Sequence, residues 1–99
     1  MKVKNIDGSS KAPFKQPPQG YDSWIAYYKN MLNYSDSKNL CCANIDCSKK
    51  NKKIVGAHVR KVYSNDKKWY IVPLCISCNG ISSCTEIDIG NTNMVAVNS

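Results

Sequence analysis

Apolar and polar residues recur at helical spacing over residues 22–34. Trp24, Tyr28 and Met31 stand at positions i, i+4 and i+7, so they share one face of a helix. We therefore expect an amphipathic helix from about residue 22 to residue 34, with this apolar stripe facing the core. Two residues at its start are suited to cap it, Asp22 and Ser23.

A change to β-branched and aromatic residues predicts a β-hairpin after residue 53. Residues 54–63 and 69–72 have strand composition, and the polar residues 64–68 between them predict a turn. Pro73 follows the second run, and we expect the strand to end there because proline lacks a backbone donor. The segment Glu86–Val97 alternates only partly and offers residues for an edge strand.

Residues 1–20 show no sustained period and combine lysines, prolines and small polar residues. This composition predicts an extended N-terminal arm. Residues 21–99 are then expected to form a single domain.

Length and composition indicate that this domain needs a stabiliser besides its core. The chain has 99 residues, of which 42% are hydrophobic, and it contains six cysteines. Small domains bury limited apolar surface, and disulfides or metal ions often compensate. No signal peptide follows Met1, and the longest apolar run, Ile71–Ile76, is far shorter than a membrane span. These features predict a cytoplasmic protein, although a secreted form with its signal removed stays open.

Four of the cysteines have the spacing of a zinc site. Cys42 and Cys47 form C-x4-C, and Cys75 and Cys78 form C-x2-C. Two tight turns of this kind direct four thiolates at one tetrahedral ion, whereas a disulfide within C-x2-C would constrain little of the chain. The sequence therefore predicts one structural zinc ion and favours it over disulfides.

The spacing leaves the other two cysteines open. Cys41 could replace Cys42 as the first ligand. Otherwise Cys41 and Cys84 are expected to be small buried apolar residues, in preference to members of a second metal site.

The positive charge of the chain is concentrated in one window. Residues 49–68 contain eight cations and one acid, which equals the net charge of the whole chain, +7. Aromatic residues lie among these cations, so we expect contact with the phosphates of DNA or RNA, with an ordinary solvated surface as the alternative. Lysine predominates, which predicts low sequence specificity. The cations are Lys49, Lys50, Lys52, Lys53, Arg60, Lys61, Lys67 and Lys68.

The order of these features resembles a zinc-containing HNH, or His-Me finger, domain. The resemblance covers about residues 42–83 and rests on the cysteine knuckle, on Gly-Ala-His-Val around His58, and on the run through Cys78 to Asn79. It implies a small α+β treble-clef fold with a ββα core, made of the hairpin and a short helix at the second knuckle and preceded by the amphipathic helix.

The resemblance also implies catalytic roles for two residues. His58 matches the general base that activates water against a phosphodiester, and Asn79 matches a residue on the helix that holds a divalent ion such as Mg²⁺. Two other positions depart from the family pattern, because Ala57 precedes the base and Tyr70 stands in place of the middle asparagine. Asn65 or Asp66 could supply a ligand only if the turn folds back.

Three functions are consistent with the sequence. The favoured one is an HNH-like domain that has lost nuclease activity and binds nucleic acid non-specifically through the basic hairpin. The alternatives are an active Mg²⁺-dependent endonuclease, with His58 as its base, and an adaptor that binds another protein.

Overall fold

Two long antiparallel strands form the centre of the fold. In a computed structural model, which describes residues 1–6, 17–35, 37–47 and 53–97, β2 (Ile54–Lys61) pairs with β3 (Trp69–Cys75). Their register runs from Ile54 opposite Cys75 to Arg60 opposite Trp69. The hairpin expected from the sequence is therefore present, and its first strand ends two residues earlier than expected.

The second strand of the hairpin continues through Pro73, contrary to the expectation that it would stop there. The Pro73 carbonyl accepts a hydrogen bond from the Ala43 amide at 2.8 Å, so the backbone polar groups of Pro73 face away from β2. A proline in this position removes no hydrogen bond from the β2–β3 ladder. The strand consequently reaches Cys75, the first residue of the second knuckle.

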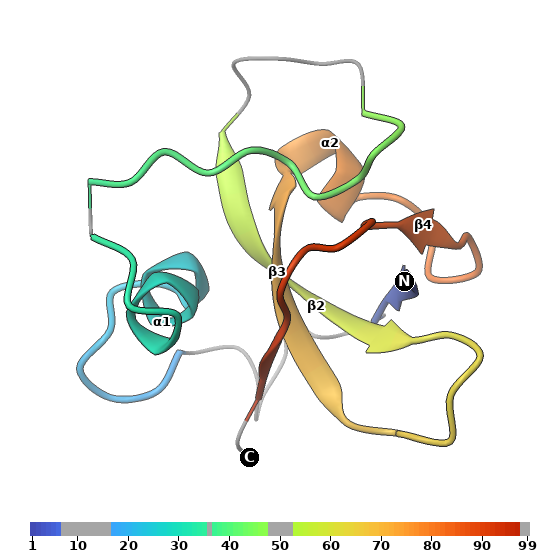
Figure 1. The fold of residues 1–99 in the computed structure, drawn as a ribbon, viewed down its shortest axis with the longest axis horizontal. Helices are drawn as coiled ribbons and strands as arrows, with labels where there is room; N and C mark the ends of the chain where they lie inside the picture. The colour runs from blue at the N-terminus through green and yellow to red at the C-terminus, as the bar shows by residue number, and fades with distance from the viewer. Residues whose placement is uncertain (7–16, 36, 48–52, 98–99) are drawn as a thin grey trace.

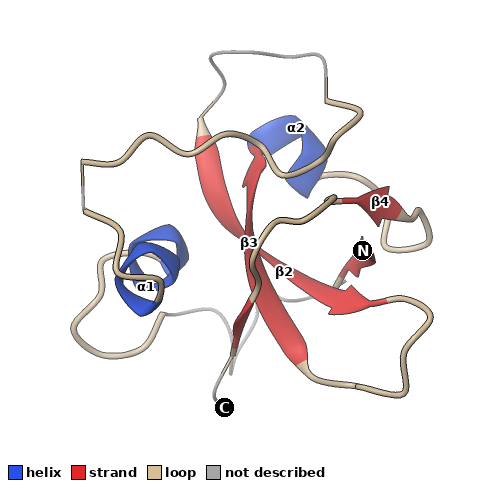
Figure 2. Cartoon of the chain, viewed as in Figure 1, coloured by secondary structure: helices blue, strands red, loops and turns tan. Residues whose placement is uncertain are grey.

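Three short strands complete an antiparallel sheet, whose order among the described residues is β4-β1-β2-β3-β5 (Figure 2). They are β1 (Lys2–Asn5), β4 (Ile87–Asp88) and β5 (Val95–Ala96). β5 lies within the segment Glu86–Val97, for which the sequence suggested an edge strand. β1 was not expected, because its four residues, with polar Lys2 and Lys4 beside buried Val3 and Asn5, are too few to show a period.

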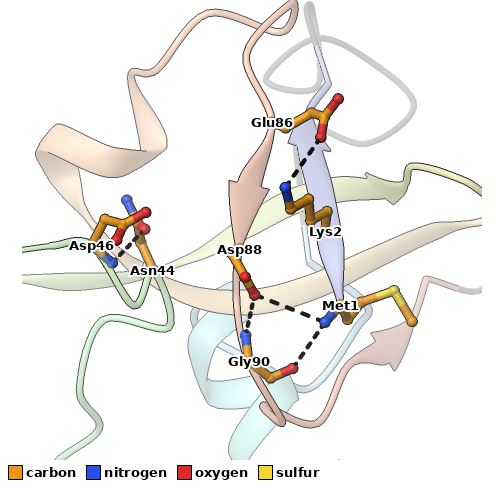
Figure 3. Close-up of polar contacts among 7 residues, drawn as sticks. All are labelled: Met1, Lys2, Asn44, Asp46, Glu86, Asp88 and Gly90. Carbon is orange, nitrogen blue, oxygen red and sulfur yellow. Dashed lines mark hydrogen bonds and ion pairs between the residues drawn. The ribbon is translucent and has the colours of Figure 1, made fainter.

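Contacts at the edge of the sheet hold β1 in place. The Ile89 amide donates to the Met1 carbonyl at 3.0 Å, and the Lys2 ammonium lies 3.8 Å from the Glu86 carboxylate (Figure 3). β1 therefore lies between β4 and β2, and Val3 is paired with both of these strands.

The two helices lie at different places along the hairpin (Figure 1). α1 (Trp24–Met31) packs against β2 and β3, whereas α2 (Ile76–Asn79) follows β3 at the end opposite the connection 62–68. No helix among the described residues is long and apolar enough to span a membrane. The part of the chain that the structure describes is thus α+β, with an antiparallel sheet and two helices, and the α+β class agrees with the expectation.

α1 is shorter than the helix expected for residues 22–34. It starts after Ser23, whose hydroxyl accepts from the Ala26 amide at 3.2 Å, so Ser23 and not Asp22 is the cap. The buried side chains are Tyr27 and Tyr28, while Met31 is 49% exposed. The expected stripe was therefore wrong at Met31, because the buried face is centred on neighbouring tyrosines near the middle of this eight-residue helix.

Apolar side chains pack on both faces of the sheet. α1 contributes to one cluster with Ile71 and Val95. Val59, Val72 and other residues form the second cluster, which also includes two of the knuckle cysteines. Because both faces are covered, the run from Ile71 to Leu74 is apolar without alternation.

Close packing of α1 on β2 depends on Gly56. A Cβ atom at this position would lie 2.7 Å from backbone atoms of Trp24 and Ile25, which is too close for any side chain. Glycine here lets the start of the helix lie directly against the strand.

Candidate metal centre

Three segments of the chain converge on the four cysteines with zinc-site spacing. Cys42 and Cys47 lie between α1 and β2, Cys75 ends β3, and Cys78 is in α2. The first knuckle is attached to the sheet by the Ala43–Pro73 hydrogen bond and by the Ile45 amide, which donates to the Asp88 carbonyl at 2.9 Å. The tertiary fold therefore brings together two pairs that are distant in the sequence.

The distances between the sulfur atoms are those of a metal site. All four Sγ atoms lie within 4.8 Å of one another, and Cys47 Sγ is 3.8 Å from Cys75 Sγ. This separation excludes a disulfide, whose sulfur atoms lie about 2.05 Å apart. A tetrahedral ion with metal–sulfur bonds of about 2.3 Å requires sulfur atoms about 3.8 Å apart. The cluster can therefore hold one metal ion.

Hydrogen bonds from the protein point at the sulfur atoms. The Cys75 amide donates to Cys42 Sγ at 3.3 Å, and the Cys78 amide donates to Cys75 Sγ at 3.5 Å. The Asn44 side-chain amide donates to Cys78 Sγ at 3.4 Å. Such donors stabilise thiolates and orient them toward an ion.

Asn44 also shapes the first knuckle. Its side-chain oxygen accepts from the Asp46 amide at 3.0 Å, as Figure 3 shows. This Asx turn reverses the chain between Cys42 and Cys47 and leaves the Asn44 amide nitrogen directed at the cluster. Asn44 was not among the residues expected at the site, although an asparagine inside a C-x4-C turn is a recognisable signal.

The surroundings of Cys42, Cys75 and Cys78 shift the pKa values of these three thiols in different directions. Burial raises the pKa of Cys42, and it raises the pKa of Cys78 to about 12. Burial acts in the same direction on Cys75, but hydrogen bonds from the Cys78 amide and from neighbouring thiols outweigh it and lower that pKa to about 7. Cys75 therefore forms a thiolate most readily of these three, and a cation that binds the cluster would displace the protons of Cys42 and Cys78.

A buried asparagine joins the second knuckle to the N-terminal strand. The Asn5 side-chain amide lies 3.0 Å from the Cys78 carbonyl, 3.2 Å from that of Asn79 and 2.9 Å from that of Ile81. These carbonyls lie at the end of α2 and just after it, where a helix leaves carbonyl groups short of donors; that of Cys78 also accepts from the Ile81 amide at 3.1 Å. Sequence reasoning missed Asn5 because nothing near it in the sequence indicates a link to residues 78–81.

Cys41 and Cys84 are exposed, which corrects the expectation that they are buried. Cys41 lies outside the cluster of four, so Cys42 is the member of the first knuckle. Cys41 is exposed, whereas its neighbour Cys42 is half-buried in the cluster. Cys84 lies in a turn between α2 and β4.

His58 lies in β2 and is 7% exposed. Its ring packs edge-on against Trp24, with centroids 4.6 Å apart, and lies 6.2 Å from the Trp69 ring. Burial lowers the pKa of His58, so the imidazole is neutral at neutral pH. Among the described residues, the only group of three or more His, Cys, Asp or Glu side chains that could share an ion is the cysteine cluster.

The other residues connected with the HNH resemblance have different surroundings. Asn79 is exposed at the end of α2. The Tyr70 hydroxyl donates to the Asp66 carboxylate, which also lies 3.3 Å from the Lys61 ammonium. The hydrogen bond from Tyr70 and one from the Lys68 amide lower the pKa of Asp66 to about 2.

The cations of the basic window lie at two separate places. Arg60, Lys67 and Lys68 are exposed near the connection 62–68, where half-buried Lys61 is engaged by Asp66. Lys53 is exposed just before the other end of β2, about 23 Å away at 3.3 Å per residue. The remaining cations of the window, Lys49, Lys50 and Lys52, lie outside the described residues.

No protein-family model, curated protein or solved structure shows a significant match to this chain.

Proposed function

We propose that this chain is a zinc-stabilised domain that binds DNA or RNA through the end of its β-hairpin, without sequence specificity. Four thiols whose sulfur atoms lie within 4.8 Å of one another suit zinc, and a closed set of four thiolates would give the ion a structural role. Free thiols of this kind suit a reducing compartment, so the proposal includes a cytoplasmic location. The HNH-like treble clef suggested by the sequence is part of the same proposal.

The observation that carries the proposal is uncompensated positive charge at one end of the sheet. Lys4 lies directly opposite Arg60 on adjacent strands, and like charges in this arrangement repel each other. The described acids nearby are engaged elsewhere, Asp66 by Lys61 and Glu86 by Lys2. A phosphate backbone would relieve this repulsion, and release of its counterions would favour binding.

Lys67 and Lys68 extend this charge into the connection between β2 and β3. Both are exposed, and neither forms an ion pair among the described residues. We therefore define the hairpin surface as Lys4, Arg60, Lys67 and Lys68. Lys53 is too distant to contact the same few phosphates.

The proposal does not include phosphodiester cleavage. A general base must reach the water that it activates, and His58 is buried behind Trp24. An HNH nuclease also needs a divalent ion beside the base, whereas Ala57 offers no ligand atom. We accordingly propose a domain that has lost the catalytic function of the family it resembles and needs no Mg²⁺.

Fluorescence anisotropy with a labelled oligonucleotide tests binding. We expect affinity to fall steeply with salt, and Lys67→Gln to reduce the slope of log K against log salt by about 1. Lys38→Gln is the matched control, because Lys38 is an equally charged, exposed residue on the connection between α1 and β2. Binding that is absent at low salt, or equally weakened by both variants, would contradict the proposal.

A plasmid-nicking assay tests the absence of cleavage. We expect no nicking by the folded, zinc-loaded protein in the presence of Mg²⁺ or Mn²⁺. Nicking that disappears in His58→Ala, with the fold retained, would instead establish the endonuclease.

A further inference from the structure

Tyr63 combines high exposure with an unfavourable backbone conformation. Its side chain is 82% exposed, and its φ angle is 44°. Asn33 is the other described residue besides glycine with positive φ, and asparagine tolerates this region far better than an aromatic residue does. The chain therefore adopts a costly conformation at Tyr63 without burying the ring.

The exposed ring is nevertheless held in a defined position. The Tyr63 hydroxyl lies 2.9 Å from both carboxylate oxygens of Glu86 and donates to that group. Glu86 in turn contacts the Lys2 ammonium, as Figure 3 shows, and the Val62 amide donates to the Lys2 carbonyl at 3.0 Å. Strand β1 thus anchors both the backbone before Tyr63 and the group that binds its hydroxyl.

The surroundings of Tyr63 indicate what the ring could contact. Tyr63 stands in the connection 62–68, which also carries Lys67 and Lys68 of the hairpin surface. The other aromatic residues of the hairpin, Trp69 and Tyr70, are half-buried. Tyr63 is therefore the aromatic ring of the hairpin that is most accessible to a ligand, and it lies in the same connection as two exposed lysines.

From these observations we infer that Tyr63 is a stacking platform for an unpaired base and that the hairpin surface selects single-stranded over double-stranded nucleic acid. This inference rests on the proposed function. The faces of unpaired bases are open to an aromatic ring, whereas pairing and stacking cover them in a duplex. Because every base has such a face, stacking adds affinity without sequence specificity, in keeping with a surface in which lysine predominates.

A backbone strained at a residue that gains little burial is itself evidence for a role outside folding. If Tyr63 served only to shape the hairpin, replacing it by a residue that adopts positive φ easily would leave nucleic-acid binding unchanged. Glycine adopts positive φ without a steric penalty, so Tyr63→Gly separates the two roles.

The test measures binding of a labelled twelve-nucleotide oligothymidine and of a duplex of the same length to three proteins: wild type, Tyr63→Phe and Tyr63→Gly. We expect Tyr63→Gly to weaken single-strand binding about 5- to 150-fold, as loss of one stacked base does, with little change for the duplex. Tyr63→Phe keeps the ring but loses the hydrogen bond to Glu86, so it should weaken single-strand binding less than Tyr63→Gly does. The melting temperature of Tyr63→Gly should not fall, because glycine relieves the strain.

Three outcomes would overturn the inference: unchanged single-strand binding by Tyr63→Gly, equal weakening toward both oligonucleotides, or a lower melting temperature that accounts for the loss. Lys67→Gln distinguishes these outcomes from failure of the proposed function. If Lys67→Gln weakens binding while Tyr63→Gly does not, the nucleic-acid surface remains and the stacking role is wrong. If neither nucleic acid binds at low salt, the proposed function fails together with the inference.

Discussion

At the scale of single residues, the direction of a side chain decides which of two adjacent cysteines can bind a metal ion. Cys42 lies in the cluster of four, and Cys41 is exposed beside it. The two residues have the same chemistry and neighbouring positions. Replacing each of them by serine therefore gives two matched variants, of which only the one at Cys42 removes a member of the cluster.

We predict that Cys42→Ser loses the bound metal ion and is destabilised by more than about 4 kcal/mol, because removal of a structural metal is among the largest single effects on stability. Cys41→Ser should change the free energy of unfolding by less than about 0.5 kcal/mol. Metal content and thermal unfolding measure both effects. Equal losses in the two variants would show that the cluster does not bind the ion through Cys42.

Burial of His58 predicts a dependence of stability on pH. Its pKa in the folded protein is below the ordinary 6.5, so the unfolded chain binds a proton first as the pH falls. The contribution of neutral His58 is therefore complete above about pH 6.5 and is lost below it, by at most about 1.4 kcal/mol per pH unit.

Urea unfolding at several pH values, in wild type and His58→Gln, checks this prediction. Cysteine protonation affects both proteins alike, so the difference between their pH profiles isolates the histidine. The wild type should lose more free energy of unfolding than the variant below pH 6.5. Parallel profiles would mean that His58 titrates normally in the folded protein.

At the scale of elements, one side chain couples the first strand to the second knuckle. Asn5 in β1 binds three carbonyls at the end of α2, the helix that carries Cys78. The stability of the metal cluster should consequently depend on a residue more than seventy positions away in the sequence.

We predict that Asn5→Ala lowers the free energy of unfolding by about 1–3 kcal/mol, because it removes the side-chain donor from part-buried carbonyls of Asn79 and Ile81. It should also weaken metal binding, since the end of α2 loses its anchor. Asn79→Ala is the control, because the backbone carbonyl that accepts from Asn5 remains. Chemical unfolding and metal titration measure both effects, and equal behaviour of the two variants would contradict the coupling.

The elements also show where sequence patterns succeed and fail. The hairpin was predicted correctly because its β-branched and aromatic residues favour strands through local sterics and packing. The prediction that the strand stops at Pro73 was wrong, because the cost of a proline depends on which segment its backbone faces. The Pro73 backbone faces Ala43, thirty residues earlier, and not β2. β1 was missed because four residues carry too little pattern to reveal a strand.

At the scale of the whole molecule, the cysteine cluster lies where three segments of the chain meet. One ion at this site would join the segment after α1 to β3 and α2, next to the apolar cluster that includes Cys75 and Cys78. In a chain of 99 residues, such a link is a large fraction of the total stability.

We therefore predict that a chelator abolishes cooperative thermal unfolding and that added zinc restores it, because metal binding and folding are coupled in small domains. Circular dichroism follows the fold, and elemental analysis follows the metal. A protein verified as metal-free that unfolds at the same temperature as the loaded protein would exclude a structural ion.

The sequence by itself determined the two cysteine knuckles, with Cys41 and Cys42 as alternatives in the first, and also the hairpin and the concentration of positive charge, because each of these features depends on residues close together in the chain. Tertiary structure alone decided that Cys42 and not Cys41 joins the cluster, that His58 is buried beside Trp24, and that β1 lies between β2 and β4. Those outcomes depend on contacts between distant segments, where packing and backbone hydrogen bonds select one arrangement among several that local spacing allows.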